Sequence, residues 1–207
     1  TYSFFVTYAN LDGFDPSTKI KKETLTKSDR WIISKTNKFI KTAEKHYKSF
    51  QVFQLMAEAT RLLDDLSNWY IRRNRRRFWK SENDSDKTAA YSTLYRVLIN
   101  FVKVISPIVP FVSDKIYGNL VSRNNETNFD SVHLCDFPSV NPSDIDENVL
   151  NEIDVVIQIV SSSRSARNKA NIRIRQPLSE LDLFAIDDIQ KIAKNNQAEI
   201  LEELNIK

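Results

Sequence analysis

Hydrophobic residues recur three and four positions apart along most of the chain, the spacing that places them on one face of an α-helix. Capping signals agree with this pattern, because Thr26 or Ser28 precedes the first helical run, and Ser106 and Pro107 open the fourth. The sequence therefore predicts a mainly α fold, a helical bundle, with helices over residues 29–47, 49–79, 87–105, 107–120, 142–170 and 187–204.

Some stretches depart from the helical period. Residues 1–27 are predicted to form an aromatic lead-in and a loop, because residues 12–16 are a cluster of turn formers. Near the C-terminus, isoleucine alternates with arginine over residues 172–175, and Leu181, Leu183 and Ala185 recur at every second position. A period of two residues is typical of a β-strand. We expect two strands there and a short strand at residues 132–134, so the bundle should be followed by the start of a small α/β module.

The composition argues against several kinds of site. The chain has two glycines in 207 residues, where about fourteen would be usual, so a glycine-rich phosphate loop is not expected. One cysteine and two histidines allow neither an internal disulfide nor a multi-cysteine zinc site. No apolar run is long enough to span a membrane. We expect no catalytic residue, no metal site, no membrane association and a cytoplasmic location.

Charge is sorted into blocks. The net charge is +3, yet residues 61–80 hold seven basic residues against two acidic ones. Residues 160–175 hold five basic residues and no acid, whereas residues 141–154 hold five acids and no base. Such sorting predicts one face that binds a polyanion, and the alternative is a set of ordinary solvated helix faces.

The first basic block reads Trp-Tyr-Ile-Arg-Arg-Asn-Arg-Arg-Arg-Phe-Trp-Lys over residues 69–80. At about 100° per residue, the apolar stripe of a continuous helix runs into Arg73 and Arg77, which either form structural ion pairs or face an external anion. Trp69 and Trp79 are assigned to the core or a mixed role, with base stacking as the alternative for Trp79. The side chains expected to bind a polyanion are Arg72, Arg75, Arg76 and Lys80.

The second basic block lies where the long helix gives way to the predicted strands. Arg164 and Arg167 share a helix face, and Lys169 follows them. Arg173 and Arg175 share one face of a strand. A helix end and a strand that both present arginine would suit a groove that follows a phosphate backbone, and the alternative is a solvated junction between two modules.

Seven motifs, in this order along residues 1–185, resemble isoleucyl-tRNA synthetases, which are class I aminoacyl-tRNA synthetases. The related valyl and leucyl enzymes share the bundle but not the arginine-dense run. The motifs are Asp29–Ser34, Asp65–Trp79, Ala90–Tyr95, Pro107–Phe111, Ser131–Leu134, Ala166–Ala170 and Arg175–Leu181.

The resemblance implies the anticodon-binding bundle of an isoleucine–tRNA ligase, a piece of a longer protein that uses ATP and Mg²⁺. The ATP-binding motifs His-Ile-Gly-His and Lys-Met-Ser-Lys-Ser are absent, so the chain alone should be inactive and hold no cofactor. The implied partners are tRNA(Ile) and the catalytic and C-terminal domains of the same protein, which should be a monomer. The implied divisions are the lead-in from a catalytic domain (1–27), the bundle (28–142), a connecting helix (143–170) and a partial α/β stem-contact module (171–207).

The same resemblance implies a positional mechanism. The bundle would hold the tRNA by its backbone and place the acceptor end in a distant catalytic site, while exposed aromatic residues near the bundle tip are candidates for stacking on anticodon bases. The sequence does not say which aromatic residues these are. The alternative function is a helical docking scaffold that has no direct contact with RNA.

Overall fold

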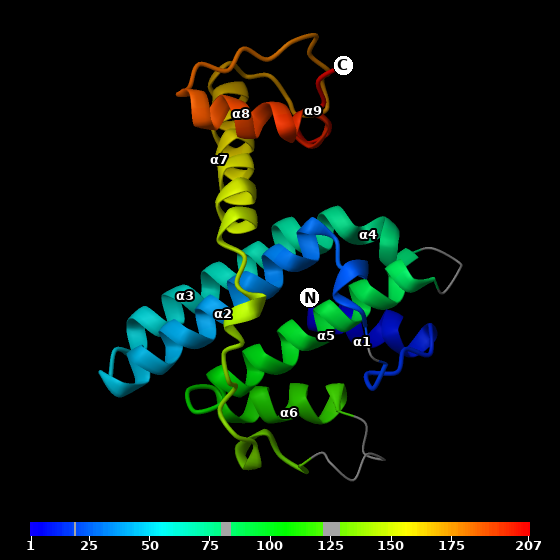
Figure 1. Cartoon of the computed structure of the whole chain (residues 1–207), viewed down its shortest axis with the longest axis vertical. Coiled ribbons are helices and arrows are strands. Elements are labelled where there is room, and N and C mark those ends of the chain that lie inside the picture. Colours follow the sequence, from blue (N-terminus) through cyan, green and yellow to red (C-terminus); the bar gives the residue numbers. More distant parts are fainter. Residues whose placement is uncertain (19, 80–83, 122–128) are drawn as a thin grey trace. The chain divides into compact units, whose positions relative to one another are not determined.

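A computed structural model describes residues 1–18, 20–79, 84–121 and 129–207 (Figure 1). The chain forms two compact units, Thr1–Asp146 and Glu147–Lys207, which are described separately below. The predicted mainly α fold is confirmed. Over the described residues no β-strand forms, and β pairing is limited to one isolated bridge between Leu178 and Ile206.

The first unit is a helical bundle in which α2 packs against α3 and α5, and α5 packs against α1, α4 and α6 (Figure 1). The largest fully buried side chains include Trp31 of α2, Phe78 of α4 and Tyr91 of α5, so these three helices share one core. The elements are α1 (Tyr2–Leu11), η1 (Lys22–Thr24), α2 (Lys27–Lys48), α3 (Val52–Asp64), the π-helical η2 (Asp65–Ile71), α4 (Arg72–Trp79), α5 (Ser85–Ile105), α6 (Pro110–Leu120), η3 (Val132–Leu134) and η4 (Pro142–Asp144).

Helix α2 begins where its capping signal predicts. Thr26 is the N-cap, its hydroxyl accepts a hydrogen bond from the Asp29 amide at 3.2 Å, and the Asp29 carboxylate accepts one from the Thr26 amide at 2.9 Å. This reciprocal capping box satisfies amide groups that have no partner inside the helix. Asp29 also puts negative charge beside the positive end of the helix dipole.

The predicted helix over residues 49–79 appears as one unbroken helical run over residues 52–79, but it is not a regular α-helix throughout. The α-helix is interrupted by the π-helical segment η2, where hydrogen bonds span five residues rather than four. Because a π-helical turn contains one residue more than an α-helical turn, the positions that face the core beyond η2 shift by one residue. Beyond η2, Asn74 and Phe78 are buried and Arg73 is half-buried, while the side chain of Arg77 is only 11% exposed.

Three other boundaries in the first unit differ from the prediction. The lead-in contains a helix, α1, whose Phe5 and Ala9 are buried. The fourth helix starts at Pro110 rather than Pro107, because Ile108 and Val109 both donate to the Ile105 carbonyl and form a turn. Residues 132–134 form a 3₁₀ helix capped by the Ser131 hydroxyl, and within the part of the chain that the structure describes no strand pairs with them.

The second unit contains α7 (Glu147–Lys169), α8 (Asp187–Asn195) and α9 (Gln197–Leu204). The predicted helix over 142–170 starts late, since residues 142–144 form η4, and the predicted helix over 187–204 breaks at Asn196. The two predicted strands do not form. Leu181 and Leu183 do alternate with exposed neighbours, but their backbone has no partner strand within the described residues.

No helix among the described residues is long and apolar enough to span a membrane. The same residues hold no group of His, Cys, Asp and Glu side chains that could bind a metal ion.

Candidate nucleic-acid interface

Arg77 lies at the centre of a buried polar network that joins α4 to α2 and α5. Its two terminal nitrogens each donate to a different oxygen of the Asp29 carboxylate at 2.9 Å, and its Nε donates to Asp86 at 2.7 Å. The Asp29 side chain is fully buried and also accepts a hydrogen bond from the Tyr70 hydroxyl at 2.6 Å. Of the two roles considered for Arg77, the geometry shows the structural ion pair.

The electrostatics of this network follow from its burial. Burial disfavours the charge of Arg77, but the hydrogen bonds and negative charge of Asp29 outweigh this effect, so the pKa of Arg77 is raised. Burial, followed by the nearby charge of Asp29, also raises the pKa of the Tyr70 hydroxyl well above its usual value. Arg77 therefore stays charged and Tyr70 stays neutral, and the network fixes the last turn of α4 against the rest of the bundle.

Arg72 and Arg73 lie beside the buried Trp69. The guanidinium of Arg73 lies 5.1 Å from the centroid of the Trp69 ring, and that of Arg72 lies 6.0 Å from it. The Nε of Arg72 also donates to the Asn68 carbonyl at 2.8 Å. Both arginines are half-buried, so the ring holds their charges at the surface of the bundle.

The outer side of α4 presents an exposed cationic and aromatic surface. Arg75 and Arg76 are exposed, and neither forms an ion pair with another described residue. The guanidinium of Arg75 lies over the ring of Trp79, 5.8 Å from its centroid, and Trp79 is 55% exposed. Lys80, which the sequence assigns to the same surface, lies outside the described residues.

The second basic block divides into inward and outward side chains. Arg164 forms an ion pair with Glu203 at 2.6 Å. Arg167 is buried, and its guanidinium donates to the carbonyls of Arg173, Ile174 and Gln176, so it holds the segment after α7 in place. The exposed members of the block are Lys169, Arg173 and Arg175.

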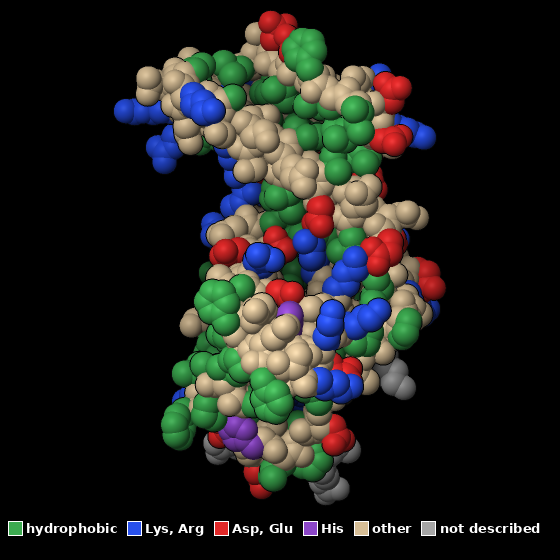
Figure 2. All heavy atoms as spheres, turned by 90° about the vertical axis from the view of Figure 1, so that its left-hand side faces the viewer, with side chains coloured by type: hydrophobic (Ala, Val, Ile, Leu, Met, Phe, Trp, Pro, Cys, Tyr) green, Lys and Arg blue, Asp and Glu red, His purple; other side chains and the backbone are tan. Residues whose placement is uncertain are grey.

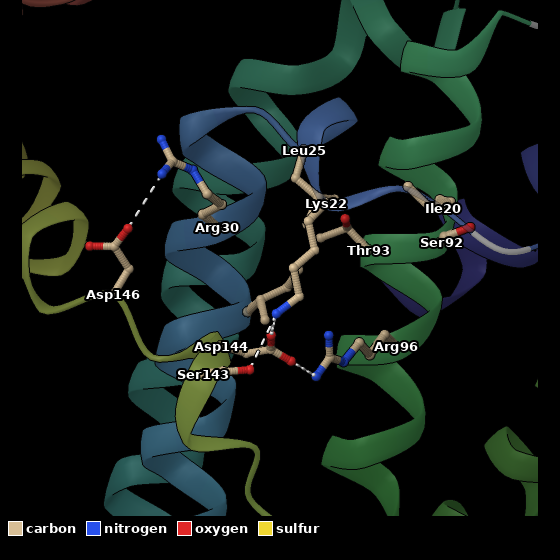
Figure 3. Close-up of a pocket in the computed structure, with 11 residues that line it drawn as sticks. Ile20, Lys22, Leu25, Arg30, Ser92, Thr93, Arg96, Ser143, Asp144 and Asp146 are labelled. Carbon is tan, nitrogen blue, oxygen red and sulfur yellow. Dashed lines mark hydrogen bonds and ion pairs between the residues drawn. The ribbon is translucent and has the colours of Figure 1, made fainter.

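A cavity of about 270 Å³ opens between α2, α5 and the segment around η4 (Figure 3). Its charged side chains pair with one another, because Asp144 binds Lys22 at 2.9 Å and Arg96 at 2.6 Å. Burial opposes ionisation of Asp144, but hydrogen bonds from Lys22 and Arg96 outweigh it, so its pKa is lowered. The Ser34 hydroxyl also bonds the Asp144 carbonyl at 2.9 Å. These contacts fasten the end of the first unit to the bundle.

The sequence alone does not identify the aromatic residues that are exposed at the bundle tip and could stack on bases. The structure exposes Phe50 and Phe53 at the turn between α2 and α3, and Phe111 at the start of α6. Tyr47 near the end of α2 donates to the carbonyl of Val104 near the end of α5, so both turns belong to one end of the bundle. The hydrophobic pattern could not identify these residues, because an exposed phenylalanine looks like a core one in sequence.

Comparison with known proteins gives one family and many relatives. The family described as "Anticodon-binding domain of tRNA ligase" matches residues 29–182. An isoleucine–tRNA ligase of Dehalococcoides mccartyi (strain CBDB1) is 43% identical over 207 residues, which is all of this chain and 20% of the relative. One from Clostridium novyi (strain NT) has the same identity and coverage. "Isoleucine--tRNA ligase 2" of Bacillus cereus is 38% identical over 210 residues, all of this chain and 19% of the relative. The chain thus spans about a fifth of their length.

Proposed function

Because the chain belongs to the family of anticodon-binding domains of tRNA ligases, we propose that it binds tRNA(Ile) as part of an isoleucine–tRNA ligase. The bundle positions the tRNA, and the aminoacylation chemistry takes place in a catalytic part of the same protein. The observation that carries the proposal is the outer side of α4, where Arg75, Arg76 and Trp79 are exposed on a helix that the Arg77 network holds rigidly.

We assign different roles to the basic residues according to their contacts. Arg75 and Arg76, with Arg72 beside them, bind backbone phosphates, since the planar guanidinium suits phosphate oxygens. Lys80 belongs to the same surface by sequence. In the second unit, the exposed side chains that bind RNA phosphates are Lys169, Arg173 and Arg175. Arg164 and Arg167, assigned to RNA contact by sequence alone, instead position the segment that carries those exposed charges.

ATP and Mg²⁺ are used by the catalytic part of the ligase, as the similarity to isoleucine–tRNA ligases implies. The ligase is a cytoplasmic monomer, and this chain contacts its catalytic and C-terminal domains. The four divisions at residues 1–27, 28–142, 143–170 and 171–207 belong to the same proposal.

The first test is binding of the 207-residue chain to tRNA(Ile) and to a non-cognate tRNA, measured by fluorescence anisotropy across a salt series. Each phosphate contact contributes about 0.7–0.9 to the slope of log K against log salt. The double variant Arg75→Ala/Arg76→Ala should therefore bind tRNA(Ile) more weakly, and the magnitude of its salt slope should be smaller by about 1.5.

The matched control is Lys191→Ala/Lys194→Ala, which also removes two exposed positive charges, but from α8, whose first turn is acidic. It should leave both affinity and slope nearly unchanged. Absence of salt-dependent binding by the unaltered chain would contradict the proposal and favour the docking scaffold. Equal loss in both variants would show that general charge, rather than the α4 surface, holds the RNA.

A further inference from the structure

The turn between α2 and α3 places an aromatic residue where the backbone disfavours one. Helix α2 ends in a Schellman motif, in which the Phe50 amide donates to the Tyr47 carbonyl at 3.2 Å and the Gln51 amide to the His46 carbonyl at 2.9 Å. This motif requires a left-handed residue after the cap, and Phe50 has φ 55°. Only glycine, and to a lesser extent asparagine, adopts that conformation without a steric penalty.

The other left-handed positions among the described residues follow the rule. Gly13 follows α1, Asn171 follows α7 and Asn205 follows α9. Each makes the same pair of backbone hydrogen bonds, so the chain uses a suitable residue at three of these four helix ends. Phe50 is the exception.

Packing does not compensate for the strain at Phe50. Its side chain is 91% exposed, and Phe53, in the first turn of α3, is 83% exposed. Val52 between them is also exposed. Two phenyl rings are thus held in solvent, one of them at a position where glycine would be less strained. A residue that costs the fold energy and gains it no buried area points to a role outside the fold.

The surroundings of these rings are cationic. The second half of α2 carries exposed Lys41, Lys45 and Lys48, and its one acid there, Glu44, pairs with Lys48 at 2.6 Å. Figure 2 looks onto this side of the first unit and shows hydrophobic side chains beside Lys and Arg side chains. The dipole of α2 accounts for cations near its C-terminus, but it does not account for the exposed rings. Aromatic faces beside positive charge are typical of surfaces that bind single-stranded nucleic acid.

We propose that Phe50 and Phe53 stack on unpaired bases of the bound tRNA, while the lysines of α2 contact the adjacent phosphates. This inference rests on the proposed function and adds to it the surface that receives the bases. Bases in an RNA loop can leave their stack and lie on an aromatic side chain, whereas paired bases in a stem cannot. The site therefore takes a loop rather than a stem.

The test uses Phe50→Gly and Phe53→Ala, singly and together, in the 207-residue chain. Because glycine suits the left-handed position, Phe50→Gly should fold as well as or better than the unaltered chain, with an equal or higher unfolding temperature. It should nevertheless bind tRNA(Ile) at least about fivefold more weakly, as should Phe53→Ala. The salt slope should not change, because no charge is lost. Phe50→Trp should retain binding, since it keeps an aromatic face.

The matched control is Phe184→Ala, which removes an equally exposed ring, 93% exposed, from the second unit. It should leave tRNA affinity unchanged. If the unaltered chain shows no salt-dependent tRNA binding, the proposed function and this inference both fail. If it binds, and Arg75→Ala/Arg76→Ala weakens binding but the two phenylalanine variants do not, the stacking inference alone is overturned. That second result would leave the rings as a docking surface for protein.

Discussion

At the residue scale, Arg77 and Arg76 are neighbours in sequence with opposite environments. Arg77 has an 11% exposed side chain and pairs with the buried Asp29, whereas Arg76 points to solvent. Arg77→Ala would leave Asp29 buried without its main counter-charge, which should cost about 3–5 kcal/mol of unfolding free energy. Urea denaturation measures this cost.

The control for this prediction is Arg76→Ala, which should change the unfolding free energy by no more than about 0.5 kcal/mol. The two variants should also separate in RNA binding, since Arg76→Ala weakens binding in a well-folded chain. Similar stabilities for the two variants would contradict the structural role of Arg77.

At the element scale, one arginine holds a segment that has no regular structure of its own. The carbonyls of Arg173, Ile174 and Gln176 are bound by Arg167, and the segment then pairs with the end of α9 through Leu178. Arg167→Met keeps much of the buried volume but removes the donors. The amides of Leu178 and Lys207, which bond to Asn205 and Leu178, should then exchange with solvent faster.

Hydrogen exchange followed by NMR checks this prediction residue by residue. Amides within α2, in the other compact unit, should keep their protection and serve as an internal reference. Lys169→Ala, which removes an exposed charge from the same helix end, is the matched control and should leave the two amides unchanged. If the Leu178 and Lys207 amides exchange at the same rate in Arg167→Met, the segment after α7 does not depend on Arg167 for its conformation.

At the scale of the whole molecule, stability should fall in acid. The pKa of Asp144 is lowered by Lys22 and Arg96 against the effect of burial, and that of Asp12 is lowered by Lys87 and Tyr91 in the same way. A carboxylate with a folded pKa below its unfolded value of about 3.9 stabilises the fold above that value. The contribution disappears as the pH falls through the folded pKa.

Urea midpoints should therefore change little between about pH 7 and 5 and drop below about pH 4. Asp144→Asn should lower the midpoint at pH 7 and reduce the loss on acidification, because it removes one of the groups that must be protonated. A variant with the full acid dependence of the unaltered chain would show that Asp144 contributes nothing to it.

Sequence reasoning predicted the helices well where a single face had to be buried. The helix over residues 29–47 appears as α2, capped by Thr26, one of the two caps that the sequence predicts, and 87–105 appears as α5. It failed where a distant partner decides the outcome. Residues 172–175 have the alternation of a strand, but a strand also requires a neighbour with free backbone groups, and that neighbour does not exist within the described chain.

The candidate site also has features that the sequence predicts and features that only the structure shows. The basic block over residues 69–79, its aromatic neighbours and the family resemblance can all be read from the order of residues. The direction of each arginine cannot, because the π-helical η2 shifts the buried stripe by one position, which places Phe78 in the core and leaves Arg77 to pair with Asp29. The exposure of Phe50 is equally invisible in sequence. The composition and periodicity of this chain thus determine a helical, cationic bundle. Only tertiary packing decides which charges it buries and which aromatic rings it presents, because burial depends on neighbours distant in sequence.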